Sequence, residues 1–132
     1  MTEFYEQVKE RLMRYVRINT ESNPHSTSVP TTSCQHDLAS VIYEELQKIG
    51  ATNVYYDKDT CVVYGSLEAN VKTGRAIGFV THMDTAPDAS GKDVKPWVLE
   101  NYDGNDIILN KEKDIVMSPN VFPNLKQYIG QD

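Results

Sequence analysis

The sequence predicts an α/β fold, in which helices and strands follow one another along a single chain. Two segments, residues 2–17 and 33–49, repeat apolar residues at helical spacing. The next two, 52–56 and 61–67, change to a pattern typical of strands. The run Ala76–Thr81 is almost wholly apolar and too short to indicate a helix. It indicates a strand buried on both faces, in the middle of a parallel or mixed sheet covered by helices.

The first helix is expected from about Thr2 to Arg17. Thr2 is a suitable N-cap, and acidic residues at the start and basic residues at the end suit the helix dipole. A polar loop, residues 18–32, follows, and His25 within it is expected to be solvated surface. The apolar residues of the helix fall on one stripe, which we expect to be buried: Phe4, Val8, Leu12, Tyr15 and Val16.

The second helix is expected from about Ser33 to Ile49, with Gly50 ending it as the C′ residue. His36 lies in its first turn, where exposure is expected rather than metal binding. Beyond it, a turn at Asp57–Asp59 predicts that the two strands form a hairpin. Later in the chain we expect short extended pieces at 97–100, 106–109 and 115–117, and a last helix at 122–129.

Composition and charge exclude several classes of protein. The net charge is −6 and the pI is about 5.0, so a basic nucleic-acid surface is not expected. No apolar run approaches the roughly 18 residues of a membrane span, and the start of the chain lacks the features of a signal peptide. Cys34 and Cys61 lie far apart, so reduced thiols are expected. These observations predict a cytoplasmic protein without nucleic-acid or membrane partners.

The polar pair His82 and Asp84 follows directly after the predicted buried strand. Side chains at i and i+2 of an extended segment project from the same face, and ligands of α/β sheets bind at the carboxyl ends of strands. In one interpretation of this pair, His82 is a metal ligand, and Asp84 either orients its ring or ligates the metal directly. Alternatively, His82 is an ordinary strand-end histidine and Asp84 caps the following loop. The spacing alone favours the second interpretation, because His-x-Asp occurs often by chance.

The residues around this pair carry a more specific signal. The block Gly78–Pro96 resembles the first metal-binding block of the peptidase T family, the bacterial cytosolic tripeptide aminopeptidases within the co-catalytic zinc peptidases. The resemblance continues through Glu100–Ile107 and Met117–Pro123, and backward to Arg14–Val16 and Gln35. It therefore covers nearly the whole chain.

The resemblance implies a fold, a reaction and site residues. The fold is a three-layer mixed sheet flanked by helices, the N-terminal part of a zinc-peptidase catalytic domain. The reaction is release of the N-terminal residue from tripeptides, with two zinc ions in the complete site. His82 is implied as a metal ligand, and Asp84 as a catalytic residue that orients this ligand. Small peptides are the implied partners, and a homodimer is possible.

The other metal ligands of the family would follow beyond Asp132. Residues 1–132 are therefore expected to be a single, truncated zinc-peptidase catalytic domain. One imidazole cannot hold zinc in a site that needs about three or four protein ligands, so the isolated chain is expected to be inactive. Two alternatives stay open: a related zinc carboxypeptidase, dipeptidase or deacylase, and a non-catalytic α/β module. The extended match after Asp84 favours peptidase T over the related hydrolases.

Overall fold

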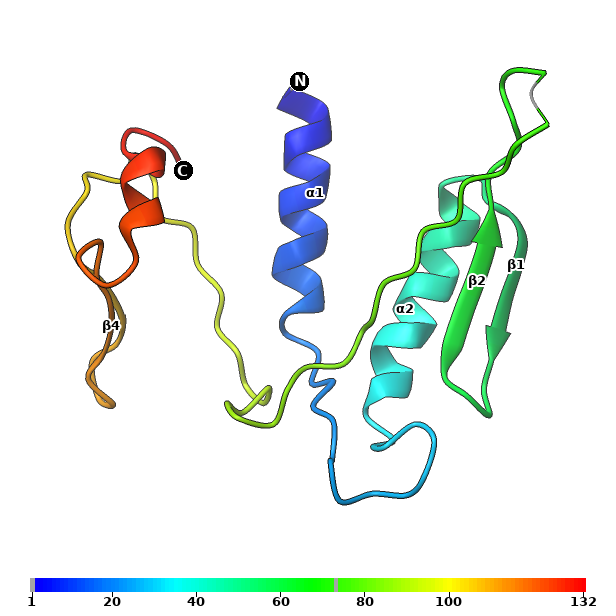
Figure 1. The fold of residues 1–132 in the computed structure, drawn as a ribbon, viewed down its shortest axis with the longest axis horizontal. Coiled ribbons are helices and arrows are strands. Elements are labelled where there is room, and N and C mark those ends of the chain that lie inside the picture. Colours follow the sequence, from blue (N-terminus) through cyan, green and yellow to red (C-terminus); the bar gives the residue numbers. More distant parts are fainter. Residues whose placement is uncertain (1, 73) are drawn as a thin grey trace. The chain divides into compact units, whose positions relative to one another are not determined.

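The computed structural model describes residues 2–72 and 74–132, which form two compact units, one ending at Pro96 and one starting at Trp97 (Figure 1). Each unit is described by itself, and the prediction of a single domain stays a prediction. No helix in these two ranges is long and apolar enough to cross a membrane. The elements are α1 (Thr2–Tyr15), α2 (Gln35–Lys48), β1 (Thr52–Asp57), β2 (Val62–Ser66), β3 (Ile107–Asn110), β4 (Ile115–Met117) and a 3-10 helix, η1 (Pro123–Tyr128).

The first unit is built around α2 and the antiparallel hairpin β1-β2. The hairpin register pairs Tyr55 with Tyr64 and Asp57 with Val62. Helix α2 contacts both strands, and at Gly65 the approach is close, since an added Cβ would lie 3.2 Å from a methyl group of Leu46. The buried apolar residues of this unit are Leu38, Ala39 and Cys61. The predicted second helix and hairpin are therefore confirmed, with ends that differ by one or two residues.

Two local devices explain why these elements end where they do. At the end of α2, Gly50 adopts a φ of 81° and donates its N–H to the Gln47 carbonyl at 3.1 Å. The Ala51 N–H donates to the Leu46 carbonyl at 3.0 Å, which completes a Schellman motif and confirms Gly50 as the C′ residue. In the hairpin turn, the Asp57 carboxylate accepts hydrogen bonds from the Thr60 hydroxyl and the Asp59 N–H, and these lower the pKa of Asp57.

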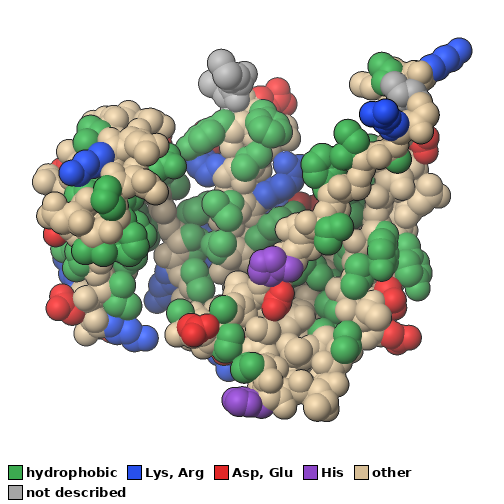
Figure 2. Space-filling model, viewed as in Figure 1, with side chains coloured by type: hydrophobic (Ala, Val, Ile, Leu, Met, Phe, Trp, Pro, Cys, Tyr) green, Lys and Arg blue, Asp and Glu red, His purple; other side chains and the backbone are tan. Residues whose placement is uncertain are grey.

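Helix α1 forms as predicted, but its apolar stripe is not buried. Phe4, Val8 and Leu12 are all exposed, and Figure 2 shows hydrophobic side chains at the surface of this helix. The stripe makes α1 amphipathic, but no element among the described residues covers it. The helix is tied to α2 instead by the Glu45 carboxylate, which accepts hydrogen bonds from Arg14 and Tyr15. The predicted capping by the Thr2 side chain lies outside the described residues.

The segment Ala76–Thr81 does not form the predicted buried strand. It is extended but unpaired, and Ile77, Phe79 and Val80 are 82–100% exposed. An extended segment becomes a strand only when a neighbour completes its backbone hydrogen bonds, and neither hairpin of the described chain pairs with it. The prediction of burial is therefore wrong for this structure. The architecture is mixed α/β, and the three-layer sheet stays a prediction.

The second unit contains the antiparallel pair β3-β4, in which Ile107 lies opposite Met117. Its buried aromatic residue is Tyr102, whose hydroxyl donates to the Asn105 carbonyl at 2.8 Å. The Tyr102 carbonyl also accepts the Gly130 N–H at 2.8 Å, which joins the end of the chain to this turn. The predicted last helix is present as the 3-10 helix η1, whereas residues 97–100 form no strand.

The exposed apolar segment predicts self-association of the 132-residue chain, because it combines unpaired backbone groups with a hydrophobic surface. We expect Val80→Lys to shift the sedimentation profile toward monomer, since a charge opposes strand pairing. Val71→Lys, at an exposed valine outside the segment, is the matched control and is expected to leave association unchanged. A wild-type chain that is monomeric at all concentrations and melts cooperatively would contradict this prediction.

The buried thiol of Cys61 predicts a loss of stability at alkaline pH. Burial raises the pKa of Cys61, and burial together with the neighbouring Cys61 raises the pKa of Tyr56. The unfolded chain then releases the protons of Cys61 and Tyr56 at lower pH than the folded chain. The contribution of these two groups to the free energy of unfolding is therefore complete below about pH 8 and is lost as the pH rises above it. We expect the melting temperature of Cys61→Ser to fall less than that of the wild type between about pH 8 and 10. Parallel pH profiles would contradict this assignment.

Candidate functional site

The structure brings His82 and Asp84 together, as the sequence predicts. The His82 Nδ1 lies 3.1 Å from the Asp84 Oδ1, and the two side chains are 83% and 41% exposed. The carboxylate therefore accepts a hydrogen bond from Nδ1, which fixes the tautomer and leaves Nε2 as the nitrogen able to bind another group. This geometry is what an oriented metal-binding histidine needs.

The chain immediately after Asp84 is anchored to a segment far away in the sequence. Thr85 forms a parallel bridge with Glu21, in which the Thr85 N–H donates to the Thr20 carbonyl at 3.2 Å. The Ser22 N–H donates to the Thr85 carbonyl at 2.9 Å, and the Ser22 hydroxyl donates to the same carbonyl at 3.1 Å. Because Thr20 is buried, this anchor is attached to the interior of the first unit.

A second anchor lies at Gly91, six positions further along the chain. Its N–H donates to the Glu21 Oε2 at 3.1 Å. A Cβ added at Gly91 would lie 2.8 Å from the Asn19 Oδ1 and 3.3 Å from the Thr85 hydroxyl. An alanine at this position would therefore force the Asn19 side chain to shift.

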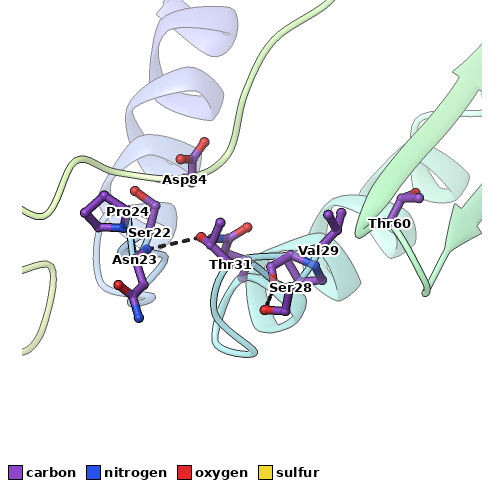
Figure 3. Close-up of a pocket in the computed structure, with 10 residues that line it drawn as sticks. Ser22, Asn23, Pro24, Ser28, Val29, Thr31, Thr60 and Asp84 are labelled. Carbon is purple, nitrogen blue, oxygen red and sulfur yellow. Dashed lines mark hydrogen bonds between the residues drawn. The ribbon is translucent and has the colours of Figure 1, made fainter. Parts of the chain in front are cut away.

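A cavity of about 400 Å³ lies beside Asp84. Asp84, Ser22, Asn23 and Pro24 lie at one side of it in Figure 3, and Thr60 lies at the other. The lining contains one carboxylate together with hydroxyl and amide groups, and no lysine, arginine or histidine. Such a lining can make hydrogen bonds to the polar groups of a ligand.

The loop on the floor of this cavity is ordered by its own hydrogen bonds. The Asn23 N–H donates to the Thr31 hydroxyl at 3.1 Å, which is drawn as a dashed line in Figure 3. The Gln35 amide also donates to this hydroxyl, at 3.2 Å. The sequence predicts residues 18–32 to be a polar loop, but it does not predict that the loop lies beside Asp84. The high content of Asn, Ser and Thr in this loop is the sequence feature that could have indicated a polar cavity lining.

The other two histidines lie away from the pair. His25 is exposed, and together with Glu21 and Lys92 it lines an adjoining cavity of about 640 Å³, which shares residues 22–24 with the cavity beside Asp84. His36 is half-buried, and its Nδ1 is hydrogen-bonded to the Tyr56 hydroxyl. The expectation that His36 is exposed is therefore wrong, because β1 packs against the first turn of α2 at this position.

The residues of this chain fit one part of a zinc site. An imidazole oriented by a carboxylate is a suitable ligand, but a tetrahedral site needs about three or four. In the ranges that the structure describes, no group of three or more His, Cys, Asp or Glu side chains could hold a metal ion. His82 and Asp84 are therefore not a complete metal site by themselves, and their predicted roles stay predictions.

Comparison with known proteins tests the resemblance predicted from the sequence around His82. The chain is 48% identical over 125 residues to peptidase T of Alkaliphilus oremlandii, covering 92% of the chain and 30% of that protein. It is 47% identical over 126 residues to peptidase T of Clostridium botulinum, covering 95% and 31%. The chain is similar to peptidase T. Peptidase T of Geobacillus kaustophilus is a further relative, 48% identical over 122 residues, with 92% and 29% covered.

The similarity to peptidase T extends along nearly the whole chain, which confirms the resemblance predicted from the block around His82. The chain spans about 30% of the length of these relatives. This coverage is consistent with the predicted N-terminal portion of a peptidase T. No protein-family model matches the chain.

The close approach at Gly91 gives a test of the anchored loop. We expect Gly91→Ala to lower the free energy of unfolding by about 1–3 kcal/mol, because its methyl group would displace the Asn19 amide. Gly78→Ala is the matched control, since an added Cβ there meets nothing within 4 Å. Chemical denaturation of both variants measures the difference. Equal stability of the two would contradict the packing at Gly91.

Proposed function

We propose that this chain is part of a zinc-dependent aminopeptidase that releases the N-terminal residue of tripeptides. The observation that carries the proposal is the His82 Nδ1 to Asp84 Oδ1 contact of 3.1 Å, in a chain 45–48% identical to several peptidases T. The contact is the arrangement that prepares a histidine for metal binding, and the relatives supply the class of reaction. Because the chain spans about 30% of these relatives, the activity is proposed for the complete natural protein.

In this proposal, His82 presents Nε2 as a zinc ligand and Asp84 accepts the Nδ1 hydrogen. The carboxylate thereby holds the ring in one tautomer and increases the electron donation of Nε2. When bound, zinc lowers the pKa of a water molecule and polarises the peptide carbonyl. The remaining ligands would come from residues other than those described, so the isolated chain is expected to be inactive.

The cavity beside Asp84 has a part in this proposal as a place for the peptide. Asn23, Thr31 and Gln35 bring amide and hydroxyl groups to its lining, and these suit the N–H and C=O groups of a short peptide. Asp84 belongs both to the lining and to the pair with His82. A peptide bound in the cavity would therefore lie next to the group that orients the proposed ligand.

A non-catalytic α/β module is the second candidate. It is supported by the incomplete donor set, since the described ranges hold no third metal-binding side chain near His82. The two candidates differ in what the natural protein contains, because an aminopeptidase needs further ligands and a docking module does not. A zinc carboxypeptidase, dipeptidase or deacylase has less support, because the relatives compared above carry the name peptidase T. The homodimer stays a prediction.

The roles of the pair are tested in the complete natural protein. We expect His82→Ala to abolish tripeptide hydrolysis and lower the zinc content, because a ligand is lost. We expect Asp84→Asn to keep the fold and to lower kcat by about 10–100-fold, since the charge that supports the ring is lost. Kinetics on trialanine and metal analysis measure both effects. His25→Ala, at an exposed histidine of the loop, is the control. Normal turnover and zinc content in His82→Ala would exclude the proposed role.

A further inference from the structure

One short segment, Asn19–Ser22, holds both ends of the loop that follows Asp84. At the first end, the main chain of this segment pairs with Thr85 through two backbone hydrogen bonds of 3.2 and 2.9 Å. At the second end, the Glu21 carboxylate accepts the Gly91 N–H at 3.1 Å. The loop between Thr85 and Gly91 is therefore closed by a clamp, which we define as the contacts of residues 19–22 with these two residues.

Glu21 is itself held in place on both sides of its main chain. Its N–H donates to the Asn19 Oδ1 at 3.2 Å, and its carbonyl accepts the Thr32 hydroxyl at 2.7 Å. These bonds fix the backbone from which the Glu21 side chain reaches Gly91. The side chain is half-buried, so its contact with Gly91 is partly protected from water. Because its backbone is fixed, the Glu21 carboxylate can determine the position of the loop at Gly91.

The loop determines in turn where Asp84 lies. Asp84 directly precedes Thr85, and its segment has no strand pairing of its own before that point in the part of the chain that the structure describes. The position of Asp84 relative to Ser22 and Asn23, which line the same cavity, therefore depends on the clamp. A displacement of about 1 Å in a reacting group can reduce a rate by about 100-fold. Control of this distance is thus a functional property as well as a structural one.

We infer that Glu21 is a positioning residue, which sets the place of the His82–Asp84 pair by holding the Gly91 end of the loop. This inference rests on the proposed function. Glu21 is not among the residues that line the cavity beside Asp84, so it acts through the loop and not on the peptide. The Gly91 N–H needs an acceptor and not a charge. The carbonyl of a glutamine at position 21 can supply that acceptor, whereas alanine cannot.

The test uses the complete natural protein with trialanine as the substrate. We expect Glu21→Ala to lower kcat by about 10–100-fold, as for residues that orient a ligand, with a smaller change in KM. We expect Glu21→Gln to restore most of kcat. Hydrogen exchange at the Gly91 amide is the second measurement, and it should become faster in Glu21→Ala but not in Glu21→Gln. Glu112→Ala, at an exposed glutamate of the second unit, is the control.

The outcomes separate this inference from the proposed function. An active wild type with the same kcat in Glu21→Ala would overturn the positioning role and leave the proposed function intact. A wild type without activity on trialanine would overturn the proposed function and with it the catalytic importance of Glu21. Exchange at Gly91 would then still decide whether the clamp exists, and unchanged exchange would overturn it. If Glu21→Ala does not fold, Glu21→Asp, one methylene shorter, gives the same comparison.

Discussion

The pairing of Thr85 with the Thr20–Ser22 segment is the interaction on which the candidate site depends. The segment that leads into His82 and Asp84 is extended and exposed, so its own surroundings do not fix its path. The first strong constraint after the pair is the two-way backbone pairing at Thr85, which ends at the buried Thr20. Main-chain hydrogen bonds are directional, and a parallel bridge fixes both the register and the direction of the chain. The Asp84 carboxylate is thereby brought to the lining of the cavity, and the His82 imidazole lies beside this carboxylate.

Helix α1 shows a different kind of attachment, by charge instead of apolar contact. Exposed ion pairs contribute only about 0–1 kcal/mol, because water solvates both partners. The Glu45 side chain is only 14% exposed, and it receives hydrogen bonds from Arg14 and Tyr15 while Arg11 lies 3.4 Å away. A carboxylate removed from water and given several donors is held more firmly than a surface pair. The helix is therefore oriented on α2 even though its apolar stripe stays uncovered.

The features that could be predicted from the sequence are those that depend on interactions between residues close together in the chain. The end of α2 at Gly50 and the hairpin turn at Asp57 depend on residues within a few positions, and both were predicted. The placement of His82 near Asp84 was also local, since it needs only an extended backbone. By contrast, burial of Ala76–Thr81 depends on strands that lie elsewhere, and the pattern could not show which ones are present. The cavity beside Asp84 was missed for the same reason, because its floor comes from a loop far away in the sequence.

The separation of the clamp residues along the chain also has a consequence for the order of folding. Helix α2 and the hairpin join neighbouring parts of the sequence, so their contacts form at a small cost in chain entropy. The Ser22 hydroxyl and the Thr85 carbonyl are 63 residues apart, and Glu21 and Gly91 are 70 apart. Closing a loop of this length costs more chain entropy than closing the short loops of α2 and the hairpin. We therefore expect the α2-hairpin core to form early and to serve as the support on which the His82–Asp84 edge is assembled last.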